Sequence, residues 1–393
     1  MLRLNERSKT WQSNTNIARL LWITTLATAL LISVQAAAFD ITRITEAPPE
    51  LLKCLTQKIG SDKVTAILKG NPPEDKKSRR QLKKAYKQCA LMTGATIPKD
   101  IAPYTGPLFD AMSQIDGTVD HDAAIERVRK SGVTRLALFA RSKKQLHQNE
   151  KAVLKLARQN PDLIVPGAPK FFQLSGDLTK AYIGATVKGI QKHGYRFIGE
   201  ILYTHADKKS GKQYSSGERY IDPSKPGTAS LLKAIATLNI PLMTHWEPYA
   251  PERDFPRFHA LYDAWPGQIF IVPHMGFASP EQVDEFMSRH PNLYMVISKK
   301  ERLMEDFSDP KKQASIGTAF LDGFRLRPQW KEILIRYQDR LIFGTDPHMK
   351  KLWQKYPITI KSQRLLLGQL PIAVATKIAH KNAEKLYGIV VNN

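Results

Sequence analysis

Short apolar segments alternate with amphipathic ones from about residue 99 to the end of the chain. The apolar segments are bounded by polar or turn-forming residues, as buried strands of a parallel sheet are. The predicted strands are 108–111, 134–140, 163–169, 197–203, 240–245, 269–274, 293–298 and 341–346. Amphipathic helices are predicted between them, among them 122–132, 149–161 and 279–291. This alternation predicts an α/β fold with eight strands, a (β/α)8 TIM barrel. A doubly wound open sheet is the alternative, but no Gly-rich dinucleotide motif follows the first strand.

The segment before the barrel follows a helical pattern. Residues 50–68 and 76–92 each place apolar residues on one helix face, and the sequence GNPPED at 70–75 separates them. They predict a small α-helical hairpin within residues 39–98. Cys54 and Cys89 are the only cysteines and fall in the two predicted helices. We therefore expect a disulfide between them in an oxidising compartment, with two buried free thiols as the alternative.

Residues 1–38 have the pattern of a cleaved signal peptide. Four basic residues precede or flank the start of the apolar run 20–34, and Ala36-Ala37-Ala38 matches a small-residue cleavage site. The run is short for a membrane span, although an uncleaved anchor is the rival interpretation. We expect a periplasmic or secreted protein with three parts: the signal peptide 1–38, the hairpin 39–98 and the barrel 99–393.

The composition is that of a globular protein, with 42% hydrophobic and 24% charged residues. The formal net charge is +23, and removal of residues 1–38 lowers it to +20. A basic surface favours an anionic substrate and a weak attraction to an anionic membrane surface, although simple solubility explains it equally well. No recognition motif accompanies the charge, so we expect no specific nucleic-acid binding. No pattern in the sequence indicates an oligomeric state.

Polar residues stand at the carboxyl ends of several predicted strands, where a TIM barrel carries its chemistry. Glu200 lies in the fourth strand, and His245, His274 and Asp346 end the fifth, sixth and eighth. A single histidine or acidic residue at a strand end is more often structural, but a barrel would bring all four side chains to one mouth. Imidazole nitrogens and carboxylate oxygens are the ligands of a catalytic divalent ion with an open position for water. These four residues are therefore candidate metal ligands, and His274 and Asp346 are candidate catalytic residues.

Basic and aromatic residues occur at the same strand ends. Arg141, Lys170 and Lys299 follow the second, third and seventh strands. Three cations around one mouth predict an anionic small-molecule substrate, a carboxylate or a phosphate ester. The alternative is that they only neutralise neighbouring acids. Tyr203 and Trp246 are candidates for an apolar wall of the substrate site, or are packing residues.

The order of these motifs resembles the amidohydrolase superfamily over most of residues 105–390. The chain has FDA at the first strand, GE at the fourth, histidines at the ends of the fifth and sixth, and FGTD at the eighth. The segment 377–389 resembles the closing helix of the amidohydrolase-related branch, which includes small decarboxylases and lactone hydrolases. The resemblance implies a metal held by two strand-one histidines, the strand-five histidine and the strand-eight aspartate. It makes His245 and Asp346 ligands and His274 an assisting residue, while Glu200 matches an acidic position found in part of the branch.

The first strand departs from that pattern, because Met112 and Gln114 stand where the two histidines belong. Neither a thioether nor an amide oxygen replaces imidazole for a hard or borderline dication. The expected cofactor is one divalent ion, zinc or manganese, in a reduced site, or no metal at all. Three interpretations remain open: hydrolysis with a reduced metal site, metal-free acid–base catalysis by Asp346 and His274, and a retired enzyme that binds a ligand or partner. The remaining polar strand ends favour the enzyme, an amidohydrolase-type hydrolase of a small anionic amide, ester or lactone.

Overall fold

The computed structural model describes residues 42–45, 47–94, 97–141, 146–170, 175–207, 216–298, 320–322 and 324–389. The chain separates into two compact units, one up to Cys89 and one from Ala90 onward. The predicted signal peptide and Lys299 lie outside the described residues. Within the described ranges, no helix combines the length and the apolar character needed to cross a lipid bilayer.

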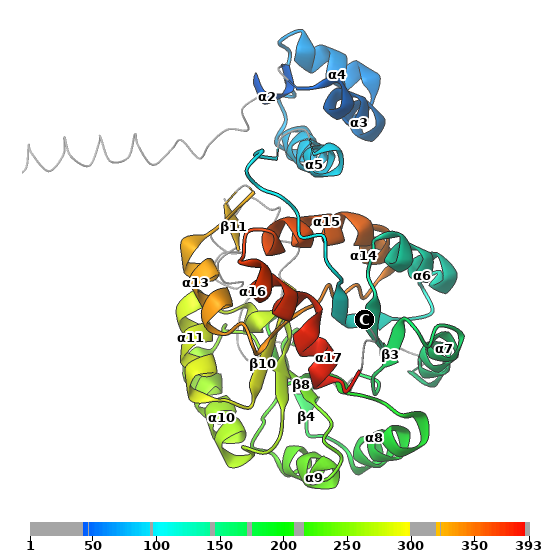
Figure 1. Cartoon of the computed structure of the whole chain (residues 1–393), viewed down its shortest axis with the longest axis vertical. Helices are drawn as coiled ribbons and strands as arrows, with labels where there is room; N and C mark the ends of the chain where they lie inside the picture. The colour runs from blue at the N-terminus through cyan, green and yellow to red at the C-terminus, as the bar shows by residue number, and fades with distance from the viewer. Residues whose placement is uncertain are drawn as a thin grey trace, which may run out of the picture. The chain divides into compact units, whose positions relative to one another are not determined.

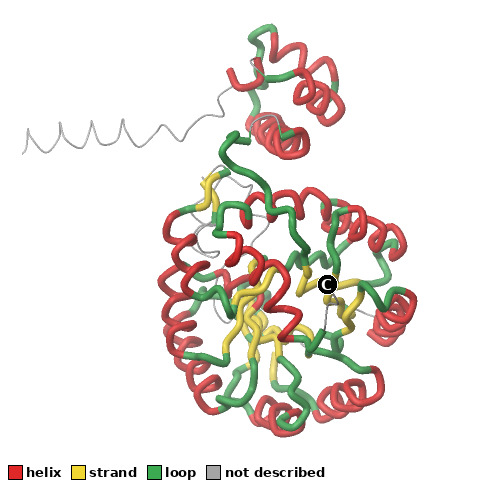
Figure 2. Tube along the Cα trace, in the orientation of Figure 1, coloured by secondary structure: helices red, strands yellow, loops and turns green. Residues whose placement is uncertain are grey.

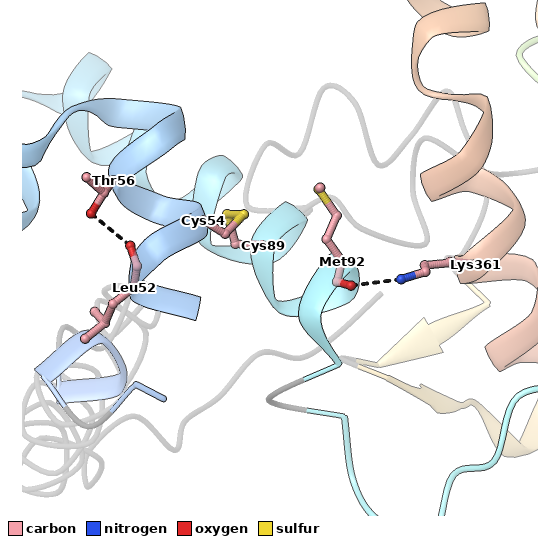
Figure 3. The surroundings of a disulfide bond; sticks show 6 residues. All are labelled: Leu52, Cys54, Thr56, Cys89, Met92 and Lys361. Carbon is pink, nitrogen blue, oxygen red and sulfur yellow. Dashed lines mark hydrogen bonds between the residues drawn. A yellow bond between two sulfur atoms is a disulfide. The ribbon is translucent and has the colours of Figure 1, made fainter. Parts of the chain in front are cut away.

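The N-terminal unit is helical (Figure 1). Its helices are α2 (Thr42–Thr45), α3 (Pro49–Ile59), α4 (Ser61–Leu68) and α5 (Lys76–Thr93). The prediction of one continuous helix over 50–68 is wrong, because Gly60 divides it into α3 and α4. Gly60 has φ 94°, a conformation that ends a helix and that only glycine adopts without strain. The predicted disulfide is confirmed: Cys54 in α3 is bonded to Cys89 in α5, with their Cα atoms 5.6 Å apart (Figure 3).

The second unit is a barrel of eight parallel strands, which confirms the predicted TIM barrel (Figure 2). Its strands are β1 (Phe109–Ile115), β2 (Arg135–Ala140), β3 (Ile164–Pro166), β5 (Ile198–Leu202), β8 (Leu242–His245), β9 (Phe270–Val272), β10 (Leu293–Ile297) and β13 (Leu341–Phe343). Two runs of paired strands, β1-β2-β3 and β5-β8-β9-β10-β13, are joined by a bridge between Ala168 and Ile198. The backbone N–H of Asp346 donates to the carbonyl of Met112 at 2.8 Å and closes the ring between β13 and β1.

Helices surround the strands and bury their apolar faces against them. They are α6 (His121–Lys130), α7 (Leu146–Gln159), α8 (Lys180–His193), α9 (Pro226–Ile235), α10 (Pro251–Ala264), α11 (Pro280–Arg289), α13 (Pro328–Arg336), α14 (Lys350–Gln354), α15 (Tyr356–Leu367), α16 (Ile372–Thr376) and α17 (Asn382–Leu386). Inside the barrel a separate apolar cluster includes Phe109, Met112 and Phe197. The Tyr387 ring contacts those of Phe109, the first residue of β1, and Phe197, which immediately precedes β5. The chain after α17 therefore covers the amino-terminal end of the barrel and leaves the carboxyl-terminal end for the site.

Strand β1 is longer than predicted and carries a bulge. The strand expected at 108–111 spans Phe109–Ile115, and its register against β2 shifts between Asp110 and Ser113. The Asp110 carboxylate accepts hydrogen bonds from Tyr356 in α15 at 2.9 Å and from the Thr345 backbone N–H at 2.9 Å. Thr345 Oγ1 donates to the same carboxylate. The bulge thus fixes β1 to the segment that follows β13, immediately before Asp346.

A cluster of histidine and acidic side chains links α10 to α11 and to His290, the residue that follows α11. His259 Nδ1 lies 2.7 Å from His290 Nε2, His259 Nε2 lies 3.1 Å from Glu285, and His290 Nδ1 lies 3.1 Å from Asp263. Burial, followed by the charge of His259, lowers the pKa of His290 to about 4. The folded protein therefore holds His290 neutral at a pH where an unfolded chain, with a histidine pKa of about 6.5, is already protonated.

We expect the folded state to lose stability as the pH falls from about 6.5 toward 4, because the unfolded chain binds the extra proton. The His290→Gln variant should show a shallower loss over this interval, measured as the free energy of unfolding at pH 7 and pH 5. His147→Gln is the matched control, since the His147 side chain is 91% exposed. An identical pH dependence in the wild type and His290→Gln would contradict this prediction.

Candidate active site

Four of the predicted site residues meet at the carboxyl ends of the barrel strands. Glu200 lies in β5, His245 ends β8, His274 follows β9 and Asp346 follows β13. Glu200 Oε1 lies 2.6 Å from His245 Nδ1 and 3.8 Å from His274 Nε2. The same His274 nitrogen lies 3.7 Å from Asp346 Oδ2. All four side chains are buried, so the structure gathers them into one dry polar cluster.

Two of these residues stand on left-handed backbone, which is rare for any residue with a side chain. Asp346 has φ 45° and His274 has φ 58°. His274 belongs to a short turn, η1 (Pro273–Phe277), in which residues 274 to 277 all have positive φ. Within it, Gly276 lies so close to the Trp246 ring that a Cβ would clash with it. Strain of this kind costs about 1–3 kcal/mol per residue and occurs preferentially at functional sites.

Lys170 and Gln114 both donate to Glu200. The Lys170 ammonium group forms an ion pair with Glu200 Oε2. Gln114 Nε2 lies 3.3 Å from the same oxygen and 2.7 Å from Asp346 Oδ1, so its amide bridges the two carboxylates. Burial alone would raise the pKa of Glu200, but the charges of Lys170 and His245 outweigh it and hold the pKa well below its ordinary value. Glu200 is therefore an anion in the folded protein.

His245 lies between two carboxylates. Its Nδ1 contacts Glu200, and its Nε2 lies 3.3 Å from Glu247 Oε1. Burial would lower the pKa of His245, but the charge of Glu200 and its hydrogen bonds to Glu200 and Glu247 raise it above the ordinary value. The two carboxylates therefore hold the His245 ring from both sides. His205 stacks against this ring with the centroids 5.7 Å apart.

His274 has a different environment, although its ring lies near that of His245. Its Nδ1 lies 2.7 Å from Ser298 Oγ, while its Nε2 faces the carboxylates of Glu200 and Asp346 beyond hydrogen-bond distance. Burial lowers the pKa of His274, helped by the charge of His245 and opposed by the two acids. The ring is therefore neutral near pH 7. Phe277 stacks on it at 4.7 Å and shields one face.

A family model described as Amidohydrolase matches residues 110–389, which is most of the chain. The chain belongs to the amidohydrolase family. The match confirms the resemblance to amidohydrolases that the strand-end motifs indicated. The protein is therefore a member of a family of hydrolases.

Comparison with solved structures finds similar barrels of low sequence identity. One is a probable 2-pyrone-4,6-dicarboxylic acid hydrolase from Acinetobacter baumannii, with 15% identity and a TM-score of 0.45 over 73% of this chain and 98% of that one. Another is an uncharacterized TIM-barrel protein, Bb4693, from Bordetella bronchiseptica, with 16% identity and a TM-score of 0.45 over 67% of this chain and 81% of that one. Comparison with curated proteins finds no match.

Tyr203 and Trp246 do not lie among the polar groups of this amidohydrolase site. Tyr203 is fully buried and its hydroxyl lies 3.2 Å from Thr228 in α9. Trp246 is fully buried and donates to the Tyr262 hydroxyl in α10 at 3.1 Å. Both belong to the apolar layer between the strands and the surrounding helices. Side chains alternate along a strand, so the neighbour of inward-facing His245 faces outward. Their placement matches the packing alternative and not the predicted substrate wall.

Arg141 is placed near the site, as predicted, and a second arginine joins it. Arg141 Nη1 donates to the carbonyl of His348 at 2.8 Å and to Asp116 at 3.3 Å. Arg219 opens β7 (Arg219–Ile221), which pairs antiparallel with β6 (Thr204–His205), so that Arg219 lies opposite His205. Paired residues of antiparallel strands project on the same face, and His205 stacks on His245.

The charges that act on the Arg219 guanidinium group are those of Arg141 and Glu200. Burial lowers its pKa, the charge of Arg141 lowers it further, and the charge of Glu200 opposes both. The β6–β7 pairing thus brings a second guanidinium group toward the side of the site where Arg141 lies. Sequence reasoning missed Arg219 because it lies on no barrel strand and no motif surrounds it. Only the β6–β7 pairing brings it to the mouth.

The predicted metal ligands can be tested against the family's metal. Ligand atoms of Glu200, His245 and His274 lie within 4.8 Å of one another, and their types suit a divalent ion. The contacts that these three residues already make do not suit a divalent ion. Both His245 nitrogens already face carboxylate oxygens, and the Lys170 ammonium group occupies Glu200 Oε2. Met112 is fully buried in the apolar interior of the barrel. A dication would have to displace Lys170 from Glu200 and separate His245 from the two carboxylates before it could bind.

Proposed function

We propose that this protein hydrolyses a small anionic ester, lactone or amide at the mouth of its barrel. The observation that supports it most is the position of His274 Nε2, 3.7 Å from Asp346 and 3.8 Å from Glu200, in an amidohydrolase-family barrel. A neutral imidazole next to a carboxylate is a pair that accepts and returns protons near pH 7.

Asp346 is the proposed base. In the proposed reaction the oxygen of a water molecule forms a bond to the substrate carbonyl carbon while Asp346 takes a proton from it. The electron pair of the C=O bond moves onto the carbonyl oxygen. The C=O bond then re-forms, the bond to the leaving oxygen or nitrogen breaks with its electron pair, and that atom takes the proton held by Asp346, which His274 relays, so that Asp346 is again a carboxylate. One water is consumed, and the products are a carboxylic acid and an alcohol or amine.

The experiment that tests this function measures turnover of a probe set containing carboxylated aryl esters, carboxylated lactones and carboxylated anilides. Release of acid or chromophore is followed for the wild type and for Asp346→Asn. We expect turnover of at least one probe by the wild type only. Binding of the probes without any turnover would contradict hydrolysis and favour the ligand-binding protein.

Arg141 and Arg219 support the choice of an anionic substrate. We expect Arg219→Met to raise the KM for a carboxylated ester about 10-fold or more, because one charge-assisted hydrogen bond is lost. The kcat/KM for the uncharged methyl ester of the same probe should change little. Lys188→Met is the matched control, since Lys188 is exposed on α8. Equal effects on the charged and uncharged probes would contradict the proposed role.

We further propose that the protein acts in the periplasm or outside the cell. The Cys54–Cys89 disulfide supports this compartment, because disulfides form and persist under oxidising conditions. Detection of the mature N-terminus near Phe39 in a periplasmic or secreted fraction would test it.

A further inference from the structure

The site contains three buried carboxylates, and protein groups already balance most of their charge. Glu200 pairs with Lys170, and His245 lies between Glu200 and Glu247. Asp346 accepts from Gln114 at 2.7 Å and lies 3.1 Å from His348 Nδ1. Buried charges are tolerated when they are paired and hydrogen-bonded in this way. A dication added to this arrangement would stand beside the Lys170 ammonium group, which would repel it.

Gln114 fixes the geometry of the two carboxylates that face each other. Its amide nitrogen has two N–H donors, and these point to Asp346 and Glu200. Turning the amide over would place its oxygen against the two anions, so this orientation is the stable one. The amide oxygen, Oε1, is then a buried acceptor without a hydrogen-bond partner among the described residues. Because the amide nitrogen of the same group contacts Asp346, this unused acceptor is available to an O–H of a water whose other proton goes to Asp346.

The ammonium group of Lys170 has more N–H donors than its contact with Glu200 uses. An ammonium group carries three N–H donors, and among the described residues Glu200 is the only side chain that contacts it. The side chain is almost fully buried and belongs to the same cluster as His245. Positive charge held in a buried site stabilises the negative charge that develops on a carbonyl oxygen during hydrolysis. A metal ion supplies that charge in other hydrolases.

We propose that Lys170 and Gln114 take the place of a metal ion in this site. Lys170 stabilises the charge that forms on the substrate carbonyl oxygen, and Gln114 orients the water that Asp346 deprotonates. Lys170 stays protonated throughout, and the bonds formed and broken are those of the hydrolysis above. This inference rests on the proposed function for its catalytic part, whereas the metal-free state of the site is measured without any substrate.

The first experiment determines the metal content of full-length mature protein purified without chelator. We expect less than about 0.1 zinc or manganese per chain, and no calorimetric binding of added zinc tighter than about 100 μM. Turnover should be unchanged after dialysis against a chelator. One zinc or manganese per chain that disappears in His274→Ala would overturn the inference.

The second experiment separates the role of Lys170 from simple packing. Lys170→Met should lower kcat at least about 100-fold with a smaller change in KM, because the charge acts on the transition state. Lys188→Met, the same change at an exposed position, should leave both constants unchanged. Wild-type kcat in a folded Lys170→Met would overturn the inference. If this variant does not fold, the metal content of the wild type still decides.

Different experimental results contradict the proposed hydrolysis and the proposed metal-free site. A wild type that contains stoichiometric metal and hydrolyses the probes overturns the metal-free site and leaves the proposed function intact. A metal-free protein that turns over no probe removes the proposed function and, with it, the catalytic roles of Lys170 and Gln114, and leaves only the metal-free state of the site.

Discussion

Replacing Asp346 with asparagine is expected to reduce kcat/KM by about 10³-fold or more. A positioned general base contributes about 10²–10⁴-fold to the rate, and asparagine cannot accept the proton. The substitution is mild for the fold, because asparagine is one of the few residues that tolerates the left-handed conformation found at φ 45°. Its amide oxygen also keeps an acceptor for Gln114.

This prediction is measured as turnover of the carboxylated probes together with thermal unfolding of the same preparations. Asp339→Asn is the matched control, because the Asp339 side chain is 71% exposed and its ion pair with Lys377 lies at the surface. It should retain full activity. A folded Asp346→Asn that keeps more than about a tenth of the wild-type kcat/KM would exclude Asp346 as the base.

The largest expected effect on stability comes from Asp110. We expect Asp110→Ala to lower the free energy of unfolding by about 3–5 kcal/mol, because each buried donor left without an acceptor costs about 1–3 kcal/mol. The donors that lose this acceptor are the Tyr356 hydroxyl, the backbone and hydroxyl of Thr345, the Ser113 hydroxyl and the Met112 backbone N–H. Because Thr345 precedes Asp346, the variant should also lose activity.

Chemical denaturation at pH 7 measures this effect. Asp100→Ala is the control, since Asp100 forms an ion pair with Arg325 on the surface, where both side chains are more than half exposed. Such a pair contributes at most about 1 kcal/mol. A loss of similar size in both variants would show that the Asp110 network does not fix β1 to the β13 end.

The sequence was sufficient to predict the barrel and its eight strands, because buried parallel strands are apolar throughout and polar residues follow directly at their ends. The same polar residues placed Glu200, His245, His274 and Asp346 together, since the carboxyl ends of all strands meet at one mouth. The structure brings these four side chains together, and the family match over residues 110–389 confirms the resemblance to amidohydrolases.

Other predictions depended on which way a side chain points. For Tyr203 and Trp246 the sequence left open an apolar wall of the substrate site or a packing role, and the alternation along a strand turns them outward into the packing layer. The helix expected over 50–68 is divided, because a glycine at position 60 adopts a positive φ that periodicity does not reveal. The bulge in β1 also lay outside the apolar pattern.

By itself, the sequence determined the barrel, the disulfide partners and the residue types available at the mouth, because these follow from local periodicity and from the ends of strands. Only the tertiary structure decided how the charges are paired. Lys170 reaches Glu200, Gln114 bridges Glu200 and Asp346, and Arg219 faces His205, in each case between segments far apart in the chain. Hydrogen bonds and ion pairs act over a few ångströms, so the proton and charge assignments exist only once the barrel has closed.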